Sequence, residues 1–253
     1  MVGEAELKTY SEDGYCLVRN LIPRDVVDAV RQRVLEGIDD PPEWMAASHV
    51  VDPSVARHPK GHPYPCGPQR PSMHEAVFGE MANHANLKAA MGEVLGDDVR
   101  LFTDQIGIKH GFFSEHEQGG CSFYHQDSWY WRIDPALGCN AWIPLQPVGR
   151  EAIALAIKPG TQKGWELVPH EQYFDEPKLG VQVGETFNAY KRHRIPLDHI
   201  DFSDEILFEM EPGDGLFFTN YTWHRSEPNR SGETKMFYAI AYQLTDEAIA
   251  RQG

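Results

Sequence analysis

The stretch Tyr124-His125-Gln126-Asp127-Ser128-Trp129-Tyr130-Trp131 carries an imidazole and a carboxylate two residues apart. If a β-strand runs through it, side chains at positions i and i+2 point to the same face, so His125 and Asp127 would aim at one point. Two such groups and one distant imidazole form the facial triad of non-heme Fe(II) sites, which leaves coordination positions open. His224, between two apolar strand-like runs, offers that imidazole. Because an isolated His-x-Asp is common, the motif by itself is a hypothesis.

The composition is that of one soluble globular domain spanning residues 1–253, with 41% hydrophobic and 24% charged residues. The formal net charge of -15 argues against a nucleic-acid surface, which needs clustered Lys and Arg, and against adsorption to anionic membranes. No apolar run is long enough to span a bilayer. The four cysteines have neither metal nor disulfide spacing, which predicts reduced thiols and a cytoplasmic protein.

The order of the expected elements favours a mainly-β (α+β) class. Helices are expected at residues 4–10, 23–36, 73–79 and 84–95, the second of them ending at Gly37. Strands are expected at residues 15–18, 100–109, around 125, 140–145, 152–157, 206–210, 216–218 and 235–244. Because no βαβ alternation follows, the pattern predicts an antiparallel sandwich or barrel backed by N-terminal helices.

Two segments, 39–71 and 162–200, are too long to be simple connections in a compact domain. Segment 39–71 has many Pro and His residues and little periodicity, so we interpret it as a long loop region, and segment 162–200 is a second long excursion rich in charge, His and Tyr. We expect them to cover the open end of the site and to supply most substrate contacts. The alternative is surface decoration or a dimer contact.

The last strand offers a cation at a suitable distance from the third imidazole. Lys235 follows His224 by eleven residues, and a hairpin could return it beside the metal, where Ser226 would share the face of His224. A cation and a hydroxyl suit a dicarboxylate that chelates iron through its other end. The alternative is a solvated lysine at a strand start. On the 100–109 strand Thr103, Gln105 and Lys109 share one face, which is either a solvent-facing edge or a polar interior.

The chain resembles the phytanoyl-CoA dioxygenase family of Fe(II)/2-oxoglutarate-dependent oxygenases over nearly its whole length. The matching pieces are Asp13-Gly14-Tyr15, Asp104-Gln105-Ile106-Gly107-Ile108-Lys109, His125-Gln126-Asp127, Trp142-Ile143-Pro144-Leu145, Pro159-Gly160-Thr161 and His224-Arg225-Ser226-Glu227-Pro228-Asn229-Arg230-Ser231. The resemblance implies a double-stranded β-helix, the jelly roll, with iron on His125, Asp127 and His224. It also implies 2-oxoglutarate near Trp142, Ser226 and Lys235, with Gln105 on the matching strand as a further cofactor-binding residue.

The chain departs from the family pattern in three places. Lys235 stands where the family usually has Arg, and a lysine holds a carboxylate as a point charge rather than with a fork. Arg230 therefore competes with Lys235 as the anchor of 2-oxoglutarate. Gln162 replaces the usual His after the Pro-Gly turn, and the stretch 149–151 is also altered. These last changes bear on the substrate more than on the chemistry.

The activity that the resemblance implies is oxidation of a small molecule by O2 with release of succinate and CO2. Hydroxylation is the default outcome, while desaturation, cyclisation and epoxidation are further outcomes of the same chemistry. Two other readings stay open: a zinc hydrolase, because two His and a carboxylate also bind catalytic zinc, and a non-catalytic binding protein on the same scaffold. The substrate and the oligomeric state are left open by the sequence.

Overall fold

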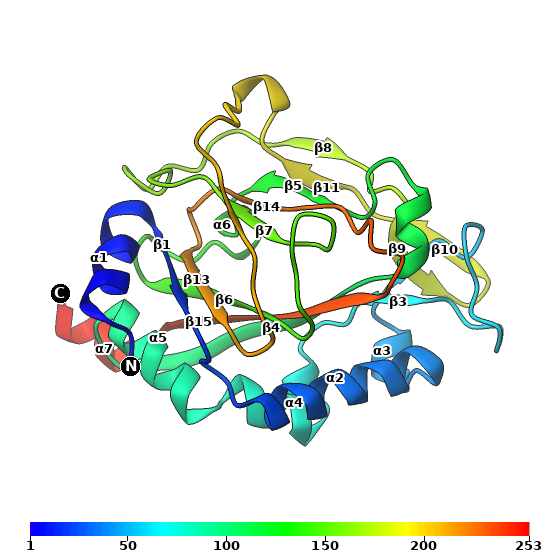
Figure 1. The fold of residues 1–253 in the computed structure, drawn as a ribbon, viewed down its shortest axis with the longest axis horizontal. Coiled ribbons are helices and arrows are strands. Elements are labelled where there is room, and N and C mark those ends of the chain that lie inside the picture. The colour runs from blue at the N-terminus through cyan, green and yellow to red at the C-terminus, as the bar shows by residue number, and fades with distance from the viewer. Residues whose placement is uncertain (253) are drawn as a thin grey trace.

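Two long antiparallel strands form the main ladder of the fold, β4 (Val99–Lys109) and β15 (Lys235–Leu244). The structure is a computed structural model that describes residues 1–252. Its larger sheet has the order β1-β13-β6-β15-β4, and a four-stranded sheet, β12-β7-β14-β5, faces it (Figure 1). The other strands of the two sheets are β1 (Tyr15–Val18), β5 (Ser122–His125), β6 (Gly138–Pro144), β7 (Leu155–Ile157), β12 (Ile206–Phe208), β13 (Gly215–Thr219) and β14 (His224–Ser226).

Alternation along β15 separates the core from the interior between the sheets. Tyr238 and Ile240 belong to the buried cluster that joins the larger sheet to the helices. Phe237 and Ala239 point the other way, into the cavity between the two sheets. This is the two-faced pattern that the sequence predicts, because successive strand residues point to opposite faces.

A layer of helices covers the outer face of the larger sheet, seen along the lower edge of Figure 1. In α2 (Arg24–Asp39) the residues Val27, Val30 and Val34 are fully buried at helical spacing. The expected stop at Gly37 was wrong: the helix continues to Asp39. Gly37 is buried where an added Cβ would lie 2.7 Å from the Met45 side chain, so a close approach of helix and side chain explains the glycine.

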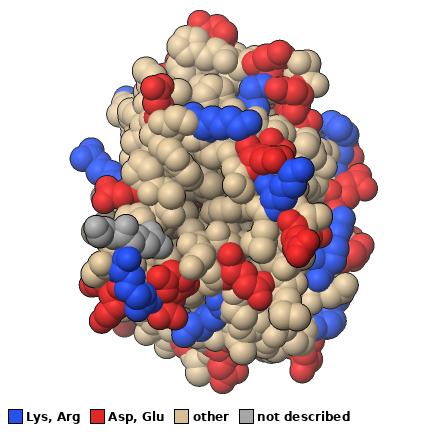
Figure 2. All heavy atoms as spheres, turned by 90° about the vertical axis from the view of Figure 1, so that its left-hand side faces the viewer, with Lys and Arg blue, Asp and Glu red and all other residues tan. Residues whose placement is uncertain are grey.

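The remaining helices are shorter than α2, and several of them add buried residues to the same cluster. They are α1 (Glu4–Asp13), α3 (Glu43–Ala46), α4 (Ala76–Ala82), α5 (Ala85–Leu95), α6 (Ser128–Trp131), α7 (Asp246–Gln252) and the 3-10 turns η1 (Pro71–Met73), η2 (Gly111–Glu115) and η3 (Leu197–His199). Among residues 1–252, no helix combines the length and apolarity needed to cross a membrane. On the face shown in Figure 2, acidic and basic side chains are interspersed around an uncharged central area.

The two long segments are not the loops that we expected. From segment 39–71, β2 (His49–Val51) and β3 (Pro65–Gly67) join β9 (Leu179–Val183) and β10 (Thr186–Ala189) of segment 162–200 in one sheet, order β10-β9-β2-β3. A two-stranded ladder, β8 (Glu171–Tyr173) with β11 (Arg192–Arg194), completes segment 162–200. Strands this short leave little local pattern in the sequence, and the pairing that joins the two segments, His49 of β2 opposite Val181 of β9, connects residues far apart in the chain.

Candidate metal centre and its cavity

The strand carrying His125 ends at that residue, and Asp127 lies beyond it. Asp127 has helical dihedrals, φ -61° and ψ -34°, and precedes the first residue of α6. The expectation of one strand running through both residues was therefore wrong. The bend is held by Gln126, which is fully buried and donates to the carbonyls of Glu166 and Tyr221. His224 on β14 lies directly opposite His125 on β5 in the strand register.

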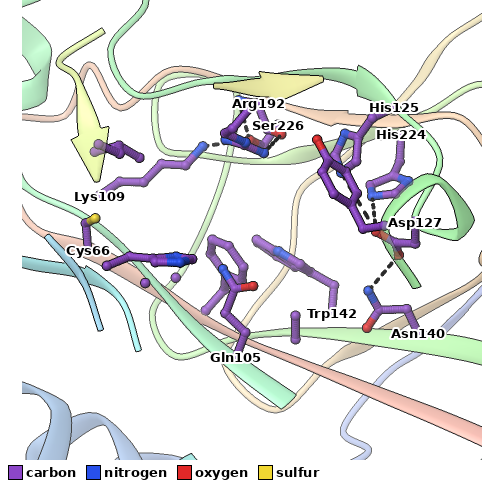
Figure 3. A pocket seen from close by; sticks show the side chains of 18 of the residues that line it. Cys66, Gln105, Lys109, His125, Asp127, Asn140, Trp142, Arg192, His224 and Ser226 are labelled. Carbon is purple, nitrogen blue, oxygen red and sulfur yellow. Dashed lines mark hydrogen bonds and ion pairs between the residues drawn. The ribbon is translucent and has the colours of Figure 1, made fainter. Parts of the chain in front are cut away.

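The three predicted ligands converge in the folded chain. Oδ1 of Asp127 lies 3.8 Å from Nε2 of His125 and 3.6 Å from Nε2 of His224. One ligand atom from each residue lies within 4.8 Å of the others, and all three residues are buried. Figure 3 shows the two imidazoles and the carboxylate facing one another at one side of the cavity. This spacing encloses a point where a single ion could contact all three.

Hydrogen bonds fix which ring nitrogens face that point. Nδ1 of His125 lies 2.8 Å from the carbonyl of Phe123, and Nδ1 of His224 lies 3.0 Å from the carbonyl of Thr222. A nitrogen that faces a carbonyl oxygen must carry the proton, so each Nε2 keeps its lone pair for a metal. Burial also lowers the pKa of His125, which favours the neutral, ligating form.

The carboxylate is oriented by a neighbour that the sequence analysis did not identify. Nδ2 of Asn140, on β6, donates to Oδ2 of Asp127 at 3.0 Å in buried surroundings. Oδ1 is thereby left facing the two imidazoles. Burial raises the pKa of Asp127, a cost that a bound cation would offset. Two neutral imidazoles, one carboxylate and an open side fit a non-heme Fe(II) ion.

A cavity of about 480 Å³ extends from this centre between the two sheets. Gln105, Trp142 and Ser226 all line it, as the resemblance implies, and Trp142 stacks on Phe237 with ring centroids 4.9 Å apart. Thr103, Gln105 and Lys109 also line it, so the polar face of β4 is a cavity wall rather than a solvent-facing edge. Both long segments contribute, segment 39–71 with His49, Cys66, Gly67 and Gln69, and segment 162–200 with Leu179, Tyr190, Lys191 and Arg192.

The structure does not bring Lys235 or Arg230 into this cavity. Nζ of Lys235 pairs with Oε2 of Glu233 at 3.0 Å. The guanidinium of Arg230 donates to main-chain carbonyls of the loop around His116. Both lie outside the described residues that line the cavity. The two cations expected from the sequence to hold 2-oxoglutarate thus have other partners here.

Another lysine occupies the place expected for Lys235. Lys109 on β4 lies directly opposite Lys235 in the register and donates from Nζ to Oγ of Ser226 at 2.6 Å. It also donates to the carbonyl of Glu227 at 3.3 Å. The sequence signal for Lys109 was its shared face with Thr103 and Gln105. Nothing in the sequence indicated Asn140.

Comparisons with known proteins identify the family of this chain. The family model described as phytanoyl-CoA dioxygenase (PhyH) matches residues 10–237. The 1-deoxypentalenic acid 11-beta-hydroxylase of Streptomyces exfoliatus is 28% identical over 234 residues, which cover 90% of this chain and 75% of that protein.

Solved structures share the fold at low identity. EvdO2 from Micromonospora carbonacea var. aurantiaca, solved with 2-oxoglutarate, has a TM-score of 0.69 and 14% identity, covering 97% of this chain and 92% of that chain. The epimerase SnoN, solved with Fe3+, alpha ketoglutarate and nogalamycin RO, has a TM-score of 0.66 and 15% identity, covering 95% of this chain and 83% of that chain. The expected jelly roll is confirmed, as two facing sheets that do not close into a barrel within residues 1–252. The chain therefore belongs to the phytanoyl-CoA dioxygenase family of Fe(II)/2-oxoglutarate-dependent oxygenases.

Proposed function

We propose that this protein is an Fe(II)- and 2-oxoglutarate-dependent dioxygenase that hydroxylates a small molecule and releases succinate and CO2. The observation that carries the proposal is the convergence of His125, Asp127 and His224 at the wall of a cavity. Hydroxylation is favoured by the name of the Streptomyces exfoliatus relative, a hydroxylase. The likeness to an epimerase shows that the same scaffold also serves a different outcome.

The residues of this chain would hold the cofactor and cosubstrate as follows. His125, Asp127 and His224 would bind iron, which supplies the redox chemistry with O2 when bound. Asn140 keeps the carboxylate in its ligating orientation. Lys109 and Ser226 would bind the distal carboxylate of 2-oxoglutarate, because the Lys109 ammonium already lies beside the Ser226 hydroxyl. Trp142 and Phe237 provide an apolar wall that keeps water away.

The decisive experiment adds Fe(II) and 2-oxoglutarate to the purified protein without O2 and records the visible charge-transfer band of the chelate. Admitting O2 should then convert 2-oxoglutarate to succinate, slowly without substrate. A zinc hydrolase would give neither signal, and a non-catalytic binding protein would give binding without succinate. A screen of small metabolites for faster succinate release would then identify the substrate.

The proposal predicts a pH dependence of 2-oxoglutarate binding. Burial of the Lys109 ammonium is the largest influence on its pKa and lowers that pKa to about 8. The ammonium is therefore present below about pH 8 and lost above it. Affinity for 2-oxoglutarate should fall by up to about tenfold per pH unit above that pKa, because the neutral amine no longer attracts the carboxylate.

Calorimetric titrations with 2-oxoglutarate between about pH 7 and 9 would measure this effect. The charged or titratable groups that act on Lys109 are Arg192, Asp175, Glu227 and Cys121. Lys109→Arg is the matched control, because arginine stays protonated and should give a flat profile. A wild-type affinity that stays constant across this range would contradict the role given to Lys109.

The two long segments are proposed to form a lid over the cavity. Both line it, and their strands pair in one sheet, so movement of one is coupled to the other. Amide hydrogen exchange should show protection rising in residues 39–71 and 162–200 when metal, 2-oxoglutarate and the screened substrate are added. Protection confined to the strands around His125 and Ser226 would instead identify the segments as fixed walls or surface decoration.

A further inference from the structure

Segment 162–200 places one arginine inside the cavity. Arg192, on β11, lines it beside Tyr190 and Lys191. Its Nη2 donates to Oγ of Ser122 at 2.7 Å, and its Nη1 donates to Oδ1 of Asp175 at 3.2 Å. The side chain of Asp175 is only 2% exposed, and its Oδ2 has no hydrogen-bond partner. A guanidinium has five donor hydrogens, so these two bonds leave most of its capacity free for a ligand.

Two serines, Ser122 and Ser226, connect this arginine to the lysine already described. The main-chain N–H of Ser122 donates to Oγ of Ser226 at 3.0 Å, and Lys109 donates to the same oxygen. Ser226 is thus contacted by Lys109 directly and linked to Arg192 through Ser122. Figure 3 shows the Lys109 and Arg192 side chains approaching each other beside Ser226, with the three metal-binding candidates farther along the cavity.

The charges in this corner do not balance. Two cations, Lys109 and Arg192, share one carboxylate, Asp175, in this corner. Glu227 also acts on Lys109, but its carboxylate is paired with Arg225, so it does not serve as a counter-ion of Lys109 alone. Burial raises the pKa of Asp175, which favours its neutral form and adds to the positive excess as long as Lys109 is protonated, below about pH 8. Uncompensated charge in a buried site is costly unless a ligand supplies the counter-ion. One ligand carboxylate would supply it.

We infer that Arg192 is a second anchor for the distal carboxylate of 2-oxoglutarate, delivered by the lid segment rather than by the strand that follows His224. The inference rests on the proposed function. Its geometric basis is the corner where Lys109 donates to Ser226 and Arg192 donates to the adjoining Ser122. An arginine fork supplies the bidentate grip that Lys109, a point charge, cannot give. Binding of the cosubstrate would then fasten segment 162–200 over the cavity before any substrate enters.

The test compares two 2-oxo acids that differ only at the far end. 2-Oxoglutarate carries the distal carboxylate, and 2-oxopentanoate has a methyl group in its place, while both offer the same chelating end. Calorimetry with Co(II)-loaded protein measures both affinities without turnover. Arg192→Gln should lower the affinity for 2-oxoglutarate by about 10- to 100-fold, the usual effect of losing a charge-assisted hydrogen bond. The same variant should keep its affinity for 2-oxopentanoate within about twofold of the wild-type affinity.

Two further variants keep the test interpretable. Arg194→Gln is the matched control, because Arg194 lies two residues away on the same strand and pairs with Glu171 instead, so its loss should leave both affinities unchanged. Arg192→Gln combined with Asp175→Asn removes the buried carboxylate that the single variant would leave unpaired. It should show the same selective loss.

The outcomes separate this inference from the proposed function. Unchanged 2-oxoglutarate affinity in Arg192→Gln, in a wild-type protein that binds it, overturns the inference and leaves the function standing. Equal losses for both 2-oxo acids would show a structural role for Arg192 and also overturn it. If the metal-loaded wild type binds neither acid, both the function and the inference fail.

Discussion

Replacing His224 with Ala is expected to remove Fe(II) binding and to reduce 2-oxoglutarate turnover to background. The variant leaves one imidazole and one carboxylate. Among residues 1–252, His125 and His224 are the two histidines whose Nε2 atoms face Asp127. Loss of an outer partner of a metal ligand typically costs about 10- to 100-fold in affinity or activity, and loss of a ligand itself should cost more. Iron content by elemental analysis and succinate release measure the two effects.

Two further variants provide an intermediate case and a control for the same iron-binding measurement. Asn140→Ala removes only the hydrogen bond that orients Asp127, so its iron affinity should fall between wild type and His224→Ala. His84→Ala serves as the control, because His84 lies at the start of α5, in the helical layer outside the larger sheet. The His84→Ala protein should therefore bind iron like the wild type. A His224→Ala protein with full iron content and activity would refute the assignment of the metal centre.

The second large effect concerns the cation that holds 2-oxoglutarate. Lys109→Met should weaken 2-oxoglutarate binding by about 10- to 100-fold, because a charge-assisted hydrogen bond contributes about 1.5–3 kcal/mol. Methionine preserves most of the apolar stem, so the cavity wall should stay packed. Titration of the Co(II)-loaded protein with 2-oxoglutarate gives the affinity directly, without any need for the unidentified substrate.

Lys235→Met is the matched comparison, since Lys235 lies opposite Lys109 in the same ladder. Its ammonium pairs with Glu233, so little change in 2-oxoglutarate affinity is expected. Arg230→Ala should likewise have little effect, because its guanidinium holds a surface loop. A selective loss in Lys235→Met, with Lys109→Met near wild type, would restore the assignment that the resemblance implied.

The contrast between Lys109 and Lys235 shows where sequence reasoning reached its limit. The sequence correctly predicted the strand that carries Lys235, and the structure shows that Phe237 and Ala239 on this strand line the cavity. Which of two lysines on adjacent strands reaches Ser226 depends on side-chain direction at the end of a ladder. Lys109 reaches Ser226 and the carbonyl of Glu227 more than a hundred residues away, and no local pattern encodes such a contact.

The metal centre shows the same division. The spacing of His125, Asp127 and His224 was enough to identify three candidate ligands, although the reason first given for their convergence, a continuous strand, was incorrect. The bend after His125 is held by Gln126, whose partners lie in segments about 40 and 95 residues later. Such a bend belongs to tertiary structure, because its hydrogen bonds close only when those distant segments are in place.

The sequence by itself determined the mainly-β class, the helical layer and the identity of the three candidate metal ligands, because these follow from periodicity and residue chemistry. Only the tertiary structure decided that segments 39–71 and 162–200 form one sheet, that Lys109 meets Ser226, and that Arg192 reaches the same corner. The physical reason is that alternation along a strand is recorded in neighbouring residues. Pairing between distant strands and the final direction of long cationic side chains depend instead on contacts that exist only after the chain has folded.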